Sequence, residues 1–172
     1  MADPTPSTSG AYREQGNEEY KKGNMLKAAA LYTRALKDDP GNAALHSNRS
    51  AALLQIHTLS KALADAEECV RLRPDWEKGH FRKGAVLEAL GRLDEVRPPG
   101  GRRAGRQRRT LHASAADACS TRGLQALAAY QTAAEYAPGS KQIADKVRTI
   151  PKLARQKQAA AAAAAAEKAA DG

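Results

Sequence analysis

The sequence predicts an all-α protein built from repeated pairs of short helices, and three observations support this. The chain has 172 residues, of which 38 are alanine and only 4% are aromatic. Such a composition favours helices packed through small side chains over a β-sandwich. Alanine and proline also recur at an interval of 34 residues, as at Ala28 and Ala62 and at Pro40 and Pro74. Finally, Gly23 and Asn24 supply a turn signal inside the first interval.

A 34-residue interval with small residues in its middle and proline near its end is typical of the tetratricopeptide repeat (TPR). In this frame the first repeat spans residues 9–42 and the second spans 43–76. A single helix pair cannot bury its apolar face alone, so the repeats must stack into a solenoid. The signature positions are occupied by Gly16, Ala28, Tyr32, Ala35 and Pro40 in the first repeat, and by Leu53, Ala62, Cys69 and Pro74 in the second.

Each helix of the first repeat has a recognisable start or stop. We expect a first helix over about residues 12–22, followed by a turn at Gly23, where positive φ is accessible. The second helix is expected over about 26–37, and Pro40 prevents its continuation. The same pattern predicts two helices in the second repeat.

The third repeat is predicted to be interrupted by an insertion. It opens as a helix and turn over residues 77–91, covers 77–95, and resumes only at 126–138. Removal of the 30 residues 96–125 restores the pattern at Ala126, Tyr130, Ala133 and Pro138. The predicted TPR domain therefore spans residues 11–138 and contains three helix pairs.

The insertion differs in chemistry from the rest of the chain. It holds seven arginines, no lysine and one acidic residue, which accounts for +6 of the formal net charge of +9. Its first codon encodes Val96, and valine codons begin with GT; its last encodes Gln125, for which CAG is one codon. These ends suggest, as a hypothesis, a retained in-frame intron, with a real insertion as the alternative.

Both ends of the chain are predicted to lie outside the repeats. Residues 1–10, rich in proline, serine and threonine, are expected to be disordered. Ser140 is a candidate N-cap for a helix over 139–150 that covers the last repeat. Pro151 is expected to interrupt that helix, and the alanine-rich segment 151–172 is expected to form a projecting helix or tail.

Several classes of protein are disfavoured. No basic segment followed by an apolar stretch opens the sequence, and the longest uncharged apolar run, 159–166, is too short to span a bilayer. Two cysteines and four scattered histidines give no metal-ligand spacing. No phosphate-binding glycine loop or recognisable nucleophile motif is present. We therefore expect a soluble, monomeric, cytoplasmic protein that is not an enzyme and uses no cofactor or metal.

A candidate site is predicted on the first helices of the three repeats, which line the concave surface of a TPR solenoid. Arg13 and Asn17 are four residues apart and share a helix face, as do Lys78 and Arg82, and Asn48 lies on the helix between them. Three cations and two amides suit the terminal and side-chain carboxylates of an extended peptide that ends in an acidic residue.

Three segments carry a resemblance to a known family: residues 12–17, 45–52 and 75–83. They resemble the carboxylate-clamp TPR co-chaperones, including domains of the heat-shock protein 70/90 organising protein and small plant and algal relatives. The resemblance covers about 12–95 and 126–138. It implies binding of the Glu-Glu-Val-Asp tail of heat-shock protein 90 or 70 by a clamp of Arg13, Asn17, Asn48, Lys78 and Arg82.

Three alternatives remain open at this stage. The groove could bind peptides of another specificity, as a general protein-interaction scaffold. Tyr20, near Asn17, could line an apolar pocket for the peptide or simply pack in the core. The arginine-rich insertion could contact nucleic acid through phosphates, although it contains no aromatic residue for base stacking. The same arginine run is typical of nuclear localisation as well.

Overall fold

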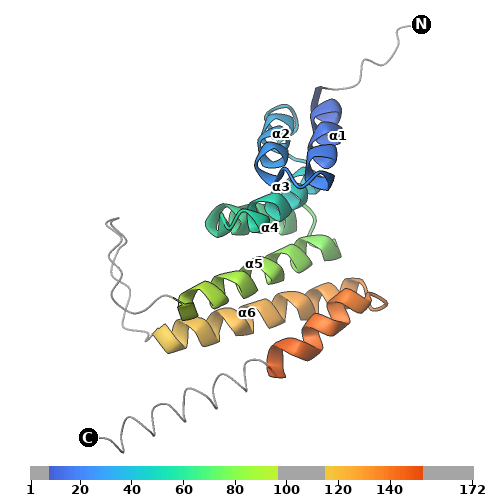
Figure 1. Ribbon diagram of the computed structural model, residues 1–172. Coiled ribbons are helices and arrows are strands. Elements are labelled where there is room, and N and C mark those ends of the chain that lie inside the picture. Colours follow the sequence, from blue (N-terminus) through green and yellow to red (C-terminus); the bar gives the residue numbers. More distant parts are fainter. Residues whose placement is uncertain (1–7, 97–114, 153–172) are drawn as a thin grey trace, which may run out of the picture.

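The structure is a computed structural model that describes residues 8–96 and 115–152; the side chains of 92–96 and 115–121 are not described. Figure 1 shows helices stacked in sequential pairs along one direction. The predicted all-α TPR fold of three helix pairs followed by one further helix is confirmed. The labelled helices are α1 Thr8–Lys21, α2 Met25–Asp38, α3 Ala43–Gln55, α4 Leu59–Leu72, α5 Glu77–Val96 and α6 Ala115–Tyr136, and the last helix spans 141–152.

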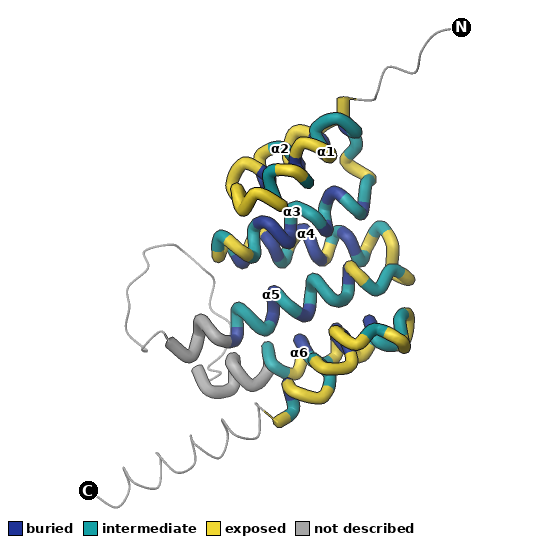
Figure 2. Tube along the Cα trace, turned by 45° about the vertical axis from the view of Figure 1, so that its right-hand side comes forward, coloured by how far each residue is buried: buried dark blue, intermediate teal, exposed yellow. Residues whose placement is uncertain are grey.

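Small residues at the predicted signature positions let the helices approach closely. Ala28, Ala35, Ala62 and Cys69 are fully buried, and Ala133 is buried at the matching position of the third pair. Figure 2 shows buried residues concentrated along α3 and α4 in the middle of the stack, with exposed residues on the outer faces of α1 and α2. The repeat pattern therefore identifies the core because it marks the helix faces that meet.

In the first and third helix pairs, a glycine of the first helix packs against a tyrosine ring of the second helix. A Cβ atom on Gly16 would lie 2.6 Å from Tyr32 Cε1, and one on Gly84 would lie 3.0 Å from the Tyr130 ring. In the middle pair the glycine is replaced by Ser50, whose hydroxyl donates a hydrogen bond of 2.8 Å to the Ala62 carbonyl. The tyrosines fill space that only glycine leaves open.

The turns within the first two repeats have the same backbone form. Gly23 has a φ of +83°, as predicted, and its equivalent in the second repeat, His57, has a φ of +57°. In each turn the following N–H reaches back to a carbonyl in the preceding helix, at 2.9 Å for Asn24 and 2.9 Å for Thr58. This hydrogen bonding is the usual way to end a helix with a left-handed residue.

The third repeat differs from the prediction at its turn. Gly91, the equivalent of Gly23, does not end a helix: α5 continues to Val96, and α6 begins at Ala115, inside the predicted insertion. Residues 115–125 thus add about three helical turns before Ala126. A glycine inside a helix costs only about 1 kcal/mol. The extension of both helices lets them pack together, since a Cβ on Gly91 would lie 3.9 Å from Arg122 Cβ.

The last helix covers the third pair. Ile143 and Ile150 are buried, and Lys146 forms a 2.7 Å ion pair with Glu88 of α5. The helix includes Pro151 and Lys152, where the described residues end, so the interruption expected near Pro151 stays a prediction.

At the other end, α1 begins at Thr8 and Ser9 is buried, so residues 8–10 are helical rather than disordered. The predictions for residues 1–7, for 97–114 of the insertion and for the tail from 153 fall outside the described residues. Within the two described ranges, no helix has the length and hydrophobicity needed to cross a bilayer.

Candidate functional site

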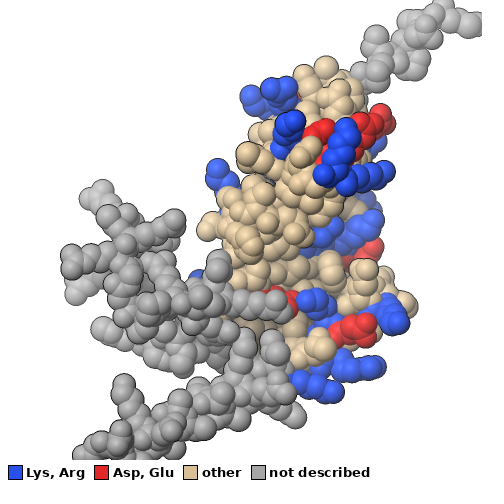
Figure 3. All heavy atoms as spheres, viewed as in Figure 1, with Lys and Arg blue, Asp and Glu red and all other residues tan. Residues whose placement is uncertain are grey.

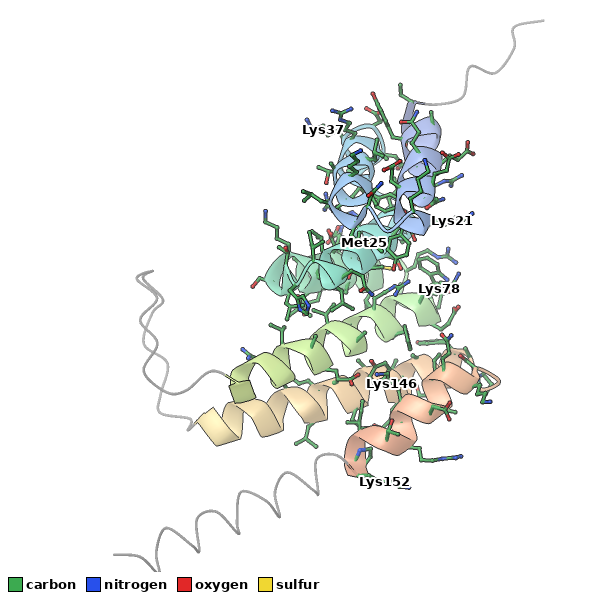
Figure 4. The ribbon with its side chains drawn as sticks, viewed as in Figure 1. Lys21, Met25, Lys37, Lys78, Lys146 and Lys152 are labelled. Carbon is green, nitrogen blue, oxygen red and sulfur yellow. The ribbon has the colours of Figure 1, made fainter. Side chains whose placement is uncertain are left out.

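The five predicted site residues lie on α1, α3 and α5. Arg13 is exposed on α1, and Asn17, one turn further along, is half-buried. Asn48 is half-buried on α3. Lys78 is exposed in the first turn of α5 and Arg82, in the next turn, is half-buried. Figure 4 shows Lys78 at the beginning of α5, on the side of the molecule where α1 ends near Lys21.

The two predicted amides are in direct contact. Asn48 Nδ2 donates a hydrogen bond of 3.3 Å to Asn17 Oδ1, and the Tyr32 hydroxyl donates to the same oxygen at 2.8 Å. Because these donors occupy the carbonyl end of Asn17, its Nδ2 group points the other way. An N–H group in that orientation suits a ligand oxygen, and a carboxylate is the oxygen ligand that accepts most strongly.

Tyr32 was not predicted as part of the site, because the sequence marks it only as a signature position of the first repeat. Its ring is 1% exposed and packs against the position of Gly16, which fixes the hydroxyl beneath Asn17. Burial, with a smaller contribution from Tyr20, raises the pKa of the Tyr32 hydroxyl, so it stays a donor at neutral pH. The signal in the sequence is the glycine–tyrosine pair, which recurs as Gly84 and Tyr130.

Tyr20 is half-buried and packs against the core of the first helix pair. The buried part of that core includes Tyr32, Leu45 and Ala52. Tyr20 therefore packs on the core with part of its side chain accessible, and its role as an apolar contact for a peptide stays a prediction.

The basic residues at the start of α5 have distinct surroundings. Lys78 Nζ lies 5.7 Å from the centroid of the Trp76 ring, and Arg73 Cζ lies 5.0 Å from the same centroid. Arg82 is close enough to the Cys69 thiol of α4 for its charge to favour the thiolate. Burial has the larger effect and raises the pKa of Cys69 to about 11.

A cavity of about 410 Å³ lies between α5 and the last helix. Phe81 and Ile150 give it apolar walls, and the Glu88–Lys146 ion pair lies at its side. The Tyr130 hydroxyl also donates to Glu88, at 3.2 Å. The residues that line this cavity do not include any of the five predicted site residues.

Figure 3 shows how charge is distributed over one face of the molecule. Lysines and arginines, interspersed with acidic residues, follow the edge where α1 ends and α5 begins. In the same view the surface over α3 and α4 is mainly uncharged.

The two histidines at equivalent repeat positions serve the connections between repeats. His46 Nε2 contacts the Pro40 carbonyl at 3.1 Å, and His80 Nε2 contacts the Pro74 carbonyl at 2.7 Å. His46 Nδ1 also lies 3.2 Å from Asp65, which Arg49 holds by two short bonds of 2.7 and 2.6 Å. Over the described parts of the chain, no three His, Cys, Asp or Glu side chains are grouped to hold a metal ion.

Several known proteins contain a segment that is similar to this chain. No protein-family model matches the chain. It is 47% identical over 79 residues to Hsp70-Hsp90 organizing protein of Triticum aestivum. The matched segment makes up 46% of this chain and 14% of that protein. It is 41% identical over 90 residues to heat shock protein STI1 of Saccharomyces cerevisiae, covering 52% and 15%. The chain thus corresponds to a small part of these relatives.

Solved structures show the same fold at lower identity. The first TPR of Spaghetti (RPAP3) bound to HSP90 peptide SRMEEVD has a TM-score of 0.65 at 22% identity, covering 86% of this chain and 94% of that one. The first TPR domain of human RPAP3 has a TM-score of 0.68 at 22% identity, covering 89% and 97%. The homologous TPR domains are non-enzymatic, which is what the sequence predicts here. The chain therefore contains a TPR domain whose sequence resembles those of the Hsp70-Hsp90 organizing proteins.

Proposed function

We propose that this TPR domain binds the acidic C-terminal peptide of heat-shock protein 90 or 70, of the Glu-Glu-Val-Asp type, and acts as a co-chaperone adaptor. The peptide's carboxylates would be held by a clamp of Arg13, Asn17, Asn48, Lys78 and Arg82. Two kinds of relative support this proposal. Sequence relatives are organizing proteins of these chaperones, and similar folds have been solved with an HSP90 peptide and with an HSP70 peptide.

The observation that supports the proposal most is the contact between Asn17 and Asn48. It joins amides from the first and second helix pairs, and Tyr32 turns the Asn17 carbonyl inward. The other end of the Asn17 amide, its Nδ2 group, can only donate. Donor groups form hydrogen bonds with a carboxylate, because all of its oxygen lone pairs are acceptors. A C-terminal amide suits such a site less well, because its NH₂ group is itself a donor.

The cations explain why binding should depend on salt. Hydrogen bonds to charged groups contribute about 1.5–3 kcal/mol each, and ordering the flexible peptide offsets part of this. Lys78 is exposed and Arg82 is half-buried, so their attraction for the peptide is partly screened by dissolved ions. We expect a micromolar-class affinity that weakens as salt is added.

The test is a calorimetric titration with the free-acid pentapeptide Met-Glu-Glu-Val-Asp and with its C-terminal amide. The free acid should bind and the amide should bind at least about tenfold more weakly, because a hydrogen-bonded charge is lost. Lys78→Ala and Arg82→Ala should abolish measurable binding while the helical circular dichroism signal is unchanged.

The matched control is Arg71→Ala, which removes one surface cation that is paired with Glu68 on α4. It should leave the affinity near the wild-type value. Equal binding of acid and amide, or wild-type affinity in Lys78→Ala and Arg82→Ala, would show that the clamp is not used.

A further inference from the structure

We propose that Trp76 is a positioning residue for the clamp: its ring holds the Lys78 ammonium group in place before the peptide arrives and so strengthens binding. This inference rests on the proposed function. Trp76 lies in the connection between α4 and α5, two residues before Lys78, and it is the only tryptophan in the chain.

The contact has the geometry of a cation–π interaction. Lys78 Nζ lies 5.7 Å from the centroid of the indole ring, and Arg73 Cζ lies 5.0 Å from it. A cation within about 6 Å of an aromatic centroid is attracted by the negative face of the ring, and tryptophan binds cations best. One ring therefore gathers two positive charges next to the first turn of α5.

The backbone beneath the ring is fixed. The Trp76 N–H donates to the Arg73 carbonyl at 3.2 Å, and the Trp76 carbonyl accepts from the Gly79 N–H at 3.0 Å. Gly79 is packed against α4, because a Cβ there would lie 3.1 Å from Cys69 Sγ and 3.2 Å from Val70 Cγ2. The start of α5 thus packs directly against α4. The half-buried Trp76 immediately precedes this packed segment.

A positioned lysine binds an anion better than a freely rotating one. The lysine side chain is long and flexible, and holding it in one geometry costs rotamer entropy. Lys78 is exposed, so packing by neighbouring residues restrains it little. In the unliganded protein the Trp76 ring restricts the Lys78 side chain. Less side-chain rotamer entropy is therefore lost when the peptide binds.

Two readouts on the same variants test this inference. In the wild-type protein, NMR signals of the Lys78 side-chain methylene protons should be shifted upfield by the indole ring. Trp76→Leu should abolish this shift and weaken binding of the free-acid pentapeptide by about two- to five-fold, the size expected for an exposed cation–π contact. Trp76→Phe should lie between wild type and Trp76→Leu in both readouts, since phenylalanine is the weaker ring.

Tyr12→Leu is the matched control. It removes a ring that lies 6.0 Å from Arg34, a cation outside the proposed clamp, and should leave the affinity for the peptide unchanged. Should Trp76→Leu fail to fold, Trp76→Phe still tests the inference through its partial loss of shift and affinity.

Two results would overturn the inference: Lys78 signals without an upfield shift in the wild type, or a folded Trp76→Leu variant that binds with wild-type affinity. If the wild-type protein itself does not distinguish the free acid from the amide, the proposed function fails, and this inference fails with it. Failure of the inference alone is recognised because the wild type still prefers the acid.

Discussion

At the scale of single residues, the most informative finding is that Tyr32 sets the orientation of Asn17. The Tyr32 hydroxyl and Asn48 Nδ2 both donate to Asn17 Oδ1, at 2.8 and 3.3 Å. One buried tyrosine therefore serves both the core and the proposed site. The link explains how the packing of the first helix pair can affect ligand binding without any contact to the ligand.

Tyr32→Phe tests this link because it removes the hydroxyl and keeps the ring against Gly16. It should lower the free energy of unfolding by about 1 kcal/mol, the value of a typical hydrogen bond. It should also weaken the binding of the free-acid pentapeptide by about threefold or more, since Asn17 loses its main orienting partner. Chemical denaturation and calorimetry measure the two effects.

The control for Tyr32→Phe is Tyr130→Phe, which removes the equivalent hydroxyl of the third helix pair. That hydroxyl donates to Glu88 of α5, an acidic residue outside the proposed clamp. Its loss should reduce stability by a similar amount and leave the affinity unchanged. Equal losses of affinity in the two variants would mean that general loosening of the fold, rather than orientation of Asn17, is responsible.

Cys69 gives a prediction about pH. Burial raises the pKa of its thiol from 9.0 to about 11. Between these values the unfolded chain releases the thiol proton while the folded protein retains it, so this residue makes the free energy of unfolding fall as pH rises. From pH 9 to pH 10 the contribution falls by about 1 kcal/mol.

The measurement compares wild type with Cys69→Ala by urea denaturation at pH 8, 9 and 10. Other groups that titrate in this range are common to both proteins, so the difference between them isolates the thiol. The stability advantage of wild type should shrink toward pH 10. A difference that is constant across the three values would contradict a raised thiol pKa.

At the scale of secondary-structure elements, the third helix pair shows that the repeat period does not predict where helices end. Gly23, His57 and Gly91 occupy equivalent positions, and the first two end their helices with positive φ. Gly91 does not, because α5 continues to Val96 and pairs with an α6 that begins at Ala115. The repeat period predicts which residues are equivalent, whereas the ends of helices depend on the sequence that follows them.

A deletion variant tests whether the insertion matters to the site. Lys78 and Arg82 lie in the first two turns of α5, and Arg82 is about 21 Å along the helix from Val96. Removal of residues 96–125 should restore the turn at Gly91 and leave peptide affinity within about twofold of the full chain, because α1, α3 and the start of α5 are unchanged. Loss of binding on deletion would show that the insertion supports the clamp.

At the scale of the whole molecule, the sequence predicts the architecture well and the site in part. Buried alanines such as Ala28 and Ala62 recur with the repeat, and so the stacked helix pairs follow from their spacing. Helical periodicity also places Arg13 beside Asn17 and Lys78 beside Arg82, since residues four apart share a face.

The remaining features of the site depend on contacts between repeats, which sequence spacing does not specify. The hydrogen bond from Asn48 to Asn17 joins residues 31 positions apart, and the Tyr32 hydroxyl joins it from another helix. The packing of Trp76 under Lys78 depends on how the α4–α5 connection turns. Each of these contacts is set by the path of the chain between elements and not by the period of the repeat.

The central claim is that donors from separate helix pairs converge on one terminal carboxylate. The most direct measurement is an NMR titration that follows the side-chain NH₂ signals of Asn17 and Asn48 as the free-acid pentapeptide is added. Both pairs of signals should shift with the same saturation curve, and the C-terminal amide should not produce these shifts at equal concentration. If the free acid binds while the Asn17 and Asn48 signals stay in place, the peptide is held elsewhere and the carboxylate clamp is contradicted.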